Sequence, residues 1–179
     1  EHHDLHMALT IAAHCNNARL QPPKSNDENW QVIGDPTEGA LLVAALKGGI
    51  DPAVFARPLF EIPFDSERKA MSVVVRENDG RLLMYTKGAP EVILGKCSYK
   101  CSNGKTVPLS DQQRSEILAA NGAMSGRALR VLALAYREVT SVTNALSEEH
   151  DLIFVGLAGM IDPPREEAKE AVQRCHHAG

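Results

Sequence analysis

Two apolar runs joined by a short turn place the strongest constraint on how this chain folds. Residues 69–77 read KAMSVVVRE, residues 81–87 read RLLMYTK, and Asn-Asp-Gly separates them. A turn of this kind between two such runs is typical of a β-hairpin. Because a hairpin pairs its strands antiparallel, the sequence predicts a sheet that is antiparallel at least at this point.

The most clearly marked helix lies upstream, in GDPTEGALLVAALKGG (residues 34–49). Asp35 stands where a helix N-cap is expected, Pro36 suits the first helical residue, and Glu38 would close an Asp-x-x-Glu capping box. Gly48 is placed to end the helix. We therefore predict a helix that begins directly after Asp35.

The other segments alternate between predicted strands and helices. We expect strands at 59–64, 128–138 and 152–162, helices at 5–19, 90–97, 110–125 and after 163, and loops at 20–29, around Gly104 and Pro108, and at 139–151. Hairpin strands mixed with helices over residues 1–151 predict an α+β fold, in which helices flank an antiparallel β-sheet.

Residues 152–179 have a different pattern. The run LIFVGLAGMID (152–162) is almost wholly apolar, as in a strand covered on both faces, and a proline-initiated helix follows it. This order is typical of a parallel α/β unit. We therefore place a domain boundary near residue 152 and expect 152–179 to be the truncated start of a neighbouring domain. The chain begins without methionine and stops within a helical pattern, so we expect it to be a piece of a longer protein.

Composition argues against several classes of protein. The net charge is −4 with both signs mixed along the chain, which argues against a nucleic-acid binder. No apolar run approaches the roughly 20 residues of a membrane helix. Only Cys97 and Cys101 of the four cysteines are close in sequence, so we expect reduced thiols and no zinc site. The GxxxxGK[ST] and GxGxxG motifs are absent, so any nucleotide must bind without a phosphate-cradling loop.

Four short stretches carry residues that suit a binding site. They are GDPTEGAL (34–41), PFDSERKAMSVV (63–74), YTKGAPE (85–91) and RALRVLALA (127–135). Each has an ordinary structural interpretation when taken alone. Asp35 would cap a helix, Phe64 would fill a core, Lys87 and Gly88 would end a strand in a turn, and the arginines would be solvated. The combination of all four is much less expected by chance.

Together these stretches resemble the nucleotide-binding (N) domain of P-type cation-transporting ATPases, and the likeness is greatest to the type II branch that includes calcium pumps. KGAPE is the most specific part, and LRVLALAYRE adds to it. The resemblance covers essentially the whole chain. FVGLAGMIDPPREEAKEAV resembles the point where the chain of these pumps re-enters the phosphorylation domain. The resemblance implies a cytoplasmic domain of an integral membrane protein.

The resemblance also implies a role for each matching residue around an adenine ring. Phe64 would stack on the ring, and Glu38 would accept a hydrogen bond from its amino group. Gly88 would let the ring lie against bare backbone. Lys87 would line the pocket and face the negative charge of the nucleotide.

Other matching residues would surround the ring and the phosphates. Lys69 and Arg130 would reach toward the phosphates, the arginine with its planar fork. Met71 and Leu132 would pack the walls of the pocket. The remaining candidates are Asp35 and Thr37, together with Ser66 and Arg68 from a turn that differs between branches of the family.

The resemblance further implies a division of labour between domains. ATP would be the ligand and Mg²⁺ would arrive with it, while the phosphorylation, actuator and transmembrane domains of the parent pump would be the partners. The DKTGT motif that carries the phosphorylated aspartate is absent. We therefore predict no catalytic residue here, and a chain that binds nucleotide without hydrolysing it.

Two other functions fit parts of the sequence. Asp162 follows the apolar run and would serve a small phosphatase of the haloacid-dehalogenase type. Histidines gather at both ends of the chain, at positions 2, 3 and 6 and at 176 and 177, and would suit a non-enzymatic metal-binding or protein-interaction module.

Overall fold

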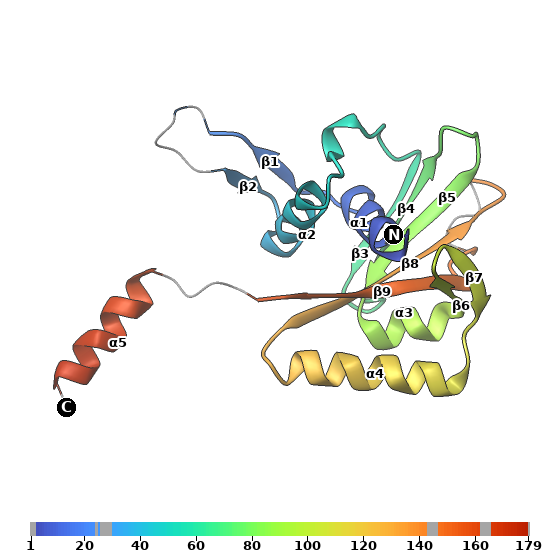
Figure 1. The fold of residues 1–179 in the computed structure, drawn as a ribbon. Coiled ribbons are helices and arrows are strands. Elements are labelled where there is room, and N and C mark those ends of the chain that lie inside the picture. The colour runs from blue at the N-terminus through green and yellow to red at the C-terminus, as the bar shows by residue number, and fades with distance from the viewer. Residues whose placement is uncertain (1–2, 24, 26–29, 143–146, 162–165, 179) are drawn as a thin grey trace.

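The predicted hairpin lies within a seven-stranded sheet in the computed structural model, which describes residues 3–23, 25, 30–142, 147–161 and 166–178 (Figure 1). β4 (Ala70–Arg76) and β5 (Leu82–Gly88) pair antiparallel without a break, from Ala70 opposite Gly88 to Arg76 opposite Leu82. Gly80 adopts a φ of +90° in the connecting turn, a conformation that favours glycine. The hairpin is therefore confirmed.

The sheet continues on both sides of this hairpin. Its strands lie in the order β3 (Phe60–Asp65), β4, β5, β8 (Arg130–Glu138), β9 (Leu152–Met160), β6 (Cys97–Ser102) and β7 (Lys105–Pro108). Neighbouring strands of this sheet run antiparallel except β6 and β9, which are parallel. The α+β class is confirmed, with a sheet that is mainly antiparallel.

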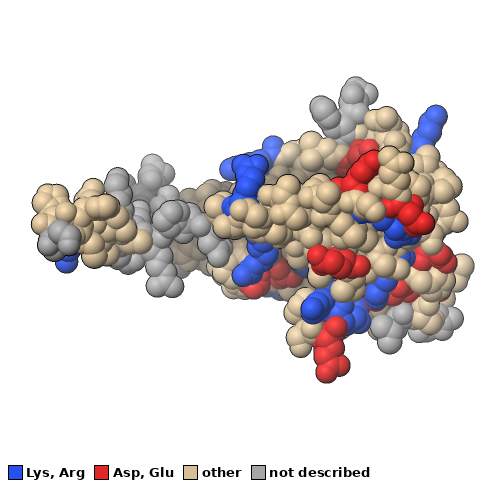
Figure 2. Space-filling model, turned by 90° about the horizontal axis from the view of Figure 1, so that it is seen from below, with Lys and Arg blue, Asp and Glu red and all other residues tan. Residues whose placement is uncertain are grey.

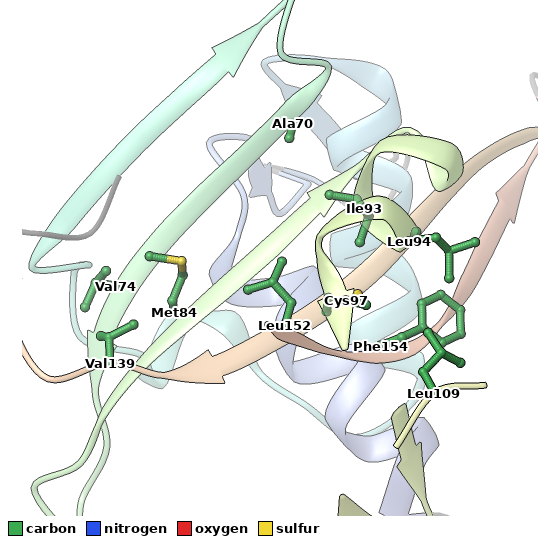
Figure 3. Packing of buried hydrophobic residues seen from close by; sticks show 12 residues of the cluster. Ala70, Val74, Met84, Ile93, Leu94, Cys97, Leu109, Val139, Leu152 and Phe154 are labelled. Atoms are coloured by element: carbon green, nitrogen blue, oxygen red, sulfur yellow. The ribbon is translucent and has the colours of Figure 1, made fainter. Parts of the chain in front are cut away.

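Helices cover both faces of the sheet. α1 (His3–His14) packs on one face beside α2 (Pro36–Lys47), and α3 (Pro90–Lys96) and α4 (Asp111–Ser125) lie on the other (Figure 1). The side chains of β4 alternate between the two layers, as successive residues of a strand must. Met71, Val73 and Val75 pack in the cluster under α1, whereas Ala70 and Val74 pack in the cluster under α3 (Figure 3). Burial on both faces explains why β4 reads as one nearly continuous apolar run.

Two hairpins lie where loops were predicted. β6 and β7 are joined by Asn103 and Gly104, with φ values of +51° and +75°, the conformations that a two-residue hairpin turn requires. The short strands β1 (Arg19–Gln21) and β2 (Gln31–Ile33) pair with each other outside the main sheet. The first helix ends earlier than the predicted residue 19, because α1 stops at His14 and β1 begins at Arg19. The remaining elements are a 3₁₀ turn, η1 (Pro52–Val54), and α5 (Glu166–Ala178).

The domain boundary predicted near residue 152 needs correction. β9 lies between β8 and β6 in the interior of the same sheet, and Leu152 and Phe154 are buried in the core cluster that Figure 3 shows. The run is apolar because an inner strand is covered on both faces, not because it begins a new domain. The sheet therefore extends through Met160. Asp162, the nucleophile of the phosphatase hypothesis, lies outside the described residues.

The surface carries charges of both signs. Figure 2 shows lysine, arginine, aspartate and glutamate side chains interspersed on the face of the molecule seen from below. In the part of the chain that the structure describes, none of the helices has the length and apolar character to cross a lipid bilayer.

Candidate functional site

A pocket of about 450 Å³ lies where four strands, β3, β4, β5 and β8, meet the N-terminus of α2. Its lining residues are Asn17, Asp35, Thr37, Glu38, Phe64, Met71, Lys87, Gly88, Arg130 and Leu132. Every residue predicted for the site lines this pocket except Lys69 and the two further candidates Ser66 and Arg68, and Asn17 is added. The volume is in the range of small-molecule sites, which span about 300–1,000 Å³.

The antiparallel register brings these distant residues together. Met71 at the start of β4 pairs with Lys87 near the end of β5, and Gly88 pairs with Ala133 in β8. The beginnings of β4 and β8 and the end of β5 therefore share one edge of the sheet. Arg130 and Leu132 come from the start of β8.

The floor of the pocket is an ion pair between a buried lysine and a partly buried glutamate. Lys87 Nζ lies 2.5 Å from Glu38 Oε1, and the two side chains are only 7% and 16% exposed. Glu38 Oε2 accepts a hydrogen bond from the backbone N–H of Asn17 at 3.0 Å. The predicted capping-box role of Glu38 is thus replaced by a role in the pocket, because both of its oxygens face groups other than the N-cap backbone. Two opposite charges at this distance leave the floor close to neutral overall.

The N-terminus of α2 forms the polar wall. Asp35 is the N-cap, as predicted, and its carboxylate accepts hydrogen bonds from the N–H groups of Thr37 at 2.8 Å and Glu38 at 3.2 Å. Burial works to raise the pKa of Asp35, but these hydrogen bonds outweigh it and hold the pKa below its ordinary value. Arg130 is exposed at the pocket, and its Nη1 donates to the hydroxyl of Thr37 at 2.7 Å.

Phe64 stands at the mouth of the pocket with 63% of its surface exposed. The interpretation of Phe64 as a core residue is therefore wrong. The pairing of β3 with β4 shifts register between Ile62 and Asp65, so that Pro63 and Phe64 together face Met71. This two-against-one arrangement is a β-bulge, a feature that redirects side chains near binding sites.

Gly88 is required by the neighbouring strand. A Cβ atom at this position would lie 2.4 Å from the carbonyl oxygen of Lys69 and 2.9 Å from Cα of Ala70. From the sequence, we expected a glycine at position 88 because a bound ring would need to lie against bare backbone. The close approach of β4 is sufficient by itself, and the backbone of Gly88 still forms part of the pocket wall.

The turn between β3 and β4 contributes less than predicted. Lys69 and Ser66 are exposed and neither lines the pocket. The φ of Lys69 is +50°, and its carbonyl accepts a hydrogen bond from the N–H of Ala89 at 2.9 Å. Arg68 is directed to backbone carbonyls of the bulge and to Glu149, not to the pocket.

Asn17 is the pocket residue that sequence reasoning missed. Its N–H contacts Glu38, and its side-chain amide donates to Glu61 Oε1 at 2.8 Å. It follows the end of α1 in the polar pair Asn16-Asn17. A polar pair after a helix usually indicates only a cap, so nothing local in the sequence distinguished it.

A second pocket, of about 680 Å³, lies away from this edge of the sheet. His14 stacks on Phe55 there, with ring centroids 3.8 Å apart, and Trp30 is also in the lining. This pocket is larger, but among the described residues no ion pair lies beside its aromatic rings. The smaller pocket is the better candidate because a partly buried acceptor, a buried cation and an exposed aromatic side chain converge in it.

Comparison with known proteins places this chain in a family. A family model described as "P-type ATPase, cytoplasmic domain N" matches residues 4–167. The match covers most of the chain, including the elements that form the pocket.

Curated relatives agree with this match. The chain is 38% identical over its whole length to a calcium-transporting ATPase of Bacillus subtilis, and 41% identical over 92% of its length to a cation-transporting ATPase of Synechocystis. It is also 38% identical over 96% of its length to a sodium/potassium exporting P-type ATPase of Schizosaccharomyces pombe. It spans only 20%, 18% and 17%, respectively, of those proteins. The chain belongs to the family of P-type ATPase cytoplasmic N domains.

Proposed function

We propose that this chain binds ATP by its adenine end in the 450 Å³ pocket, with Phe64 as the stacking platform. The observation that carries the proposal is the exposed ring of Phe64 beside the ion pair of Lys87 and Glu38. An exposed aromatic ring next to a partly buried acceptor offers a planar base one stacking face and one hydrogen-bonding edge.

The adenine ring would contact three kinds of group. Stacking on Phe64 contributes about 1–3 kcal/mol for a base on an aromatic ring. Glu38 would accept a hydrogen bond from the exocyclic amino group, since a carboxylate has lone pairs beyond those its present partners use. Met71 and Leu132 supply apolar walls, and the backbone of Gly88 supplies a flat one.

The phosphates would extend toward the mouth of the pocket. Arg130 is exposed there and its planar guanidinium suits phosphate oxygens. Lys69 is exposed on the adjoining turn, and we propose it as a contact for phosphates that extend past the pocket. Lys87, at the floor, would line the base side, with its charge offset by Glu38.

Mg²⁺ would be carried by the nucleotide phosphates. The two carboxylates of the pocket, Asp35 and Glu38, are already engaged by backbone N–H groups and by Lys87. Within the described residues, no group of three or more His, Cys, Asp or Glu side chains is placed to hold a metal ion. The pocket therefore does not fit a resident Mg²⁺, whose usual ligands are carboxylates and phosphates together.

In the parent protein we propose that this domain delivers ATP within a cation-transporting pump on the cytoplasmic side. The chain beyond Met160 would lead into the phosphorylation domain, which would hold the aspartate that accepts the γ-phosphate. Hinge closure between the two domains would bring the reacting groups into position. The actuator and transmembrane domains would couple this step to cation movement.

Amide chemical-shift mapping tests ATP binding directly. We expect ATP and ADP to shift the same amides around Phe64, Lys87 and Gly88, with a Kd of roughly 0.1–1 mM for the isolated chain. Inorganic tripolyphosphate serves as the control, because it lacks the base and should leave the amide of Phe64 unshifted. Absence of shifts at these three residues at several millimolar ATP would rule the proposal out.

A further inference from the structure

The β-bulge that presents Phe64 is held by one arginine. Arg68 Nη2 donates to the carbonyl oxygens of Pro63 at 2.8 Å, Ala70 at 2.7 Å and Ile62 at 3.3 Å. These carbonyls lie on both sides of the register shift, where the regular ladder is interrupted. Backbone acceptors at such a point need another donor, and the guanidinium supplies it.

The arginine is in turn held by a carboxylate from a distant part of the chain. Glu149, in the segment that precedes β9, forms ion pairs with Arg68 and Lys96, and its side chain is only 3% exposed. It also accepts a hydrogen bond from Ser72 Oγ at 2.6 Å, and Ser72 lies 2.9 Å from the hydroxyl of Thr86. The carboxylate is therefore buried, paired with two cations and hydrogen-bonded.

A buried charge of this kind determines where its partners lie. Burial of Glu149 without the cations would be costly, and an Arg68 without the carboxylate would be drawn to water. The ion pair thus fixes the guanidinium beneath the bulge. The bulge in turn fixes the backbone on which Phe64 is exposed.

We propose that Glu149, acting through Arg68, is a positioning residue for the Phe64 platform. Neither residue lines the pocket. Glu149 sets the orientation of Arg68, Arg68 sets the bulge, and the bulge sets the ring against which a base stacks. The consequence for ligand affinity rests on the proposed ATP function, whereas the consequence for the mobility of the ring does not.

Lys96 provides a matched control. It pairs with the same carboxylate as Arg68, but it lies at the end of α3, and its hydrogen bond goes to Glu149 and not to the bulge carbonyls. Lys96→Gln removes one of the two cations and leaves Arg68 bound. An effect that arises only from weakening a buried ion network would appear in this variant as well.

A single tryptophan at the platform reports on the ring directly. The chain has one tryptophan, Trp30, which is 61% exposed, so Trp30→Phe with Phe64→Trp gives a reporter protein with its only indole at the platform. Glu149→Gln, Arg68→Lys and Lys96→Gln are each added to this reporter. The fluorescence anisotropy without ligand and the ATP dependence of the emission are measured on chains that circular dichroism shows to be folded.

We expect Glu149→Gln and Arg68→Lys to lower the anisotropy and weaken ATP binding about 5- to 20-fold, through partial loss of base stacking. Lys96→Gln should change both by less than about twofold, because the bulge contacts remain. Arg68→Lys keeps a cation for Glu149, so it carries the test if Glu149→Gln does not fold. Unchanged anisotropy in folded Glu149→Gln and Arg68→Lys, or an equal effect of Lys96→Gln, overturns the proposal.

The two proposals fail in different ways. If the reporter itself shows no response to ATP, the nucleotide function is wrong, while lowered anisotropy in Arg68→Lys still supports the positioning of the ring. If the reporter responds to ATP with the same affinity and anisotropy in all of the variants, the positioning role is wrong and nucleotide binding stands.

Discussion

Phe64 makes a direct test possible because it is exposed rather than packed. We expect Phe64→Ala to weaken ATP binding by about 1–3 kcal/mol, the range for stacking of a base on an aromatic ring. The free energy of unfolding should change by less than about 0.5 kcal/mol, since little surface is buried there. Titration calorimetry with ATP and urea unfolding measure the two quantities.

Phe60 offers a matched control in the same strand. It is 40% exposed, pairs with Val74 and does not line the pocket. Phe60→Ala should leave the Kd for ATP unchanged. Equal loss of affinity in both variants would show that the effect of Phe64→Ala comes from β3 as a whole.

The close packing around Gly88 leads to a prediction about the free energy of unfolding. A methyl group there would lie 2.4 Å from the carbonyl oxygen of Lys69 and 2.9 Å from Cα of Ala70, so Gly88→Ala should lower the free energy of unfolding by about 1–3 kcal/mol. Gly95→Ala is the control, because a Cβ there meets nothing within 4 Å and alanine favours a helix. Thermal unfolding without nucleotide distinguishes this from a role in ligand contact alone, which would leave stability unchanged.

At the level of elements, the Glu149 network joins the turn after β3, the end of α3 and the segment before β9. Burial works to raise the pKa of Glu149, but hydrogen bonds from Lys96, Ser72 and Arg68 outweigh it and lower the pKa below its ordinary value of 4.5. The charged form is therefore favoured in the folded state. Its contribution to stability is complete above pH 4.5 and is lost as the pH falls through the lower pKa of the folded state.

The lowered pKa of Glu149 predicts a measurable pH dependence of the free energy of unfolding. In Glu149→Gln the free energy of unfolding should be lower at neutral pH and should fall less steeply on acidification than in the unmodified chain. Urea unfolding at several pH values below 4.5 tests it. Parallel profiles for the two proteins would mean that Glu149 does not contribute to acid sensitivity.

The elements differ in how well the sequence predicted them, and the reason is physical. The β4–β5 hairpin and α2 carry local signals, a turn with Gly80 and a cap at Asp35, and both were predicted closely. The β6–β7 hairpin had the Asn103-Gly104 signal as well, but its strands are polar and half-exposed, so alternation was weak. The misplaced boundary at β9 reflects a real ambiguity, because burial on both faces makes any inner strand apolar whatever the direction of its neighbours.

The pocket and the ion network beneath the β-bulge show the same division between local and distant information. Phe64, Lys87 and Gly88 were found from motifs, since each lies in a stretch with a recognisable pattern. Asn17 and Glu149 were not, because their roles depend on contacts 21 and 81 residues away in the chain. Such contacts leave no periodic trace in the sequence.

For the whole molecule, the position of β9 predicts where the chain can be shortened. Ending the chain after residue 151 removes an inner strand and exposes the apolar surface that covers Leu152 and Phe154. We expect that fragment to be unfolded, and a fragment that ends after residue 161 to fold and bind ATP. Circular dichroism and amide spectra of both fragments test this, and a folded fragment 1–151 would contradict the assignment of β9 to the sheet.

The same strand has a consequence for how the molecule forms during synthesis. Among the described strands of the sheet, β9 is the last in the chain, yet it lies between β8 and β6. Strands β3, β4, β5 and β8 can associate early, and so can β6 with β7, but the two groups share no hydrogen-bonded edge until β9 enters between them. Because domains generally fold as units when their chain emerges, nascent copies should expose two unpaired strand edges until residue 160 has left the ribosome. That interval is when chaperone binding or aggregation would compete with folding.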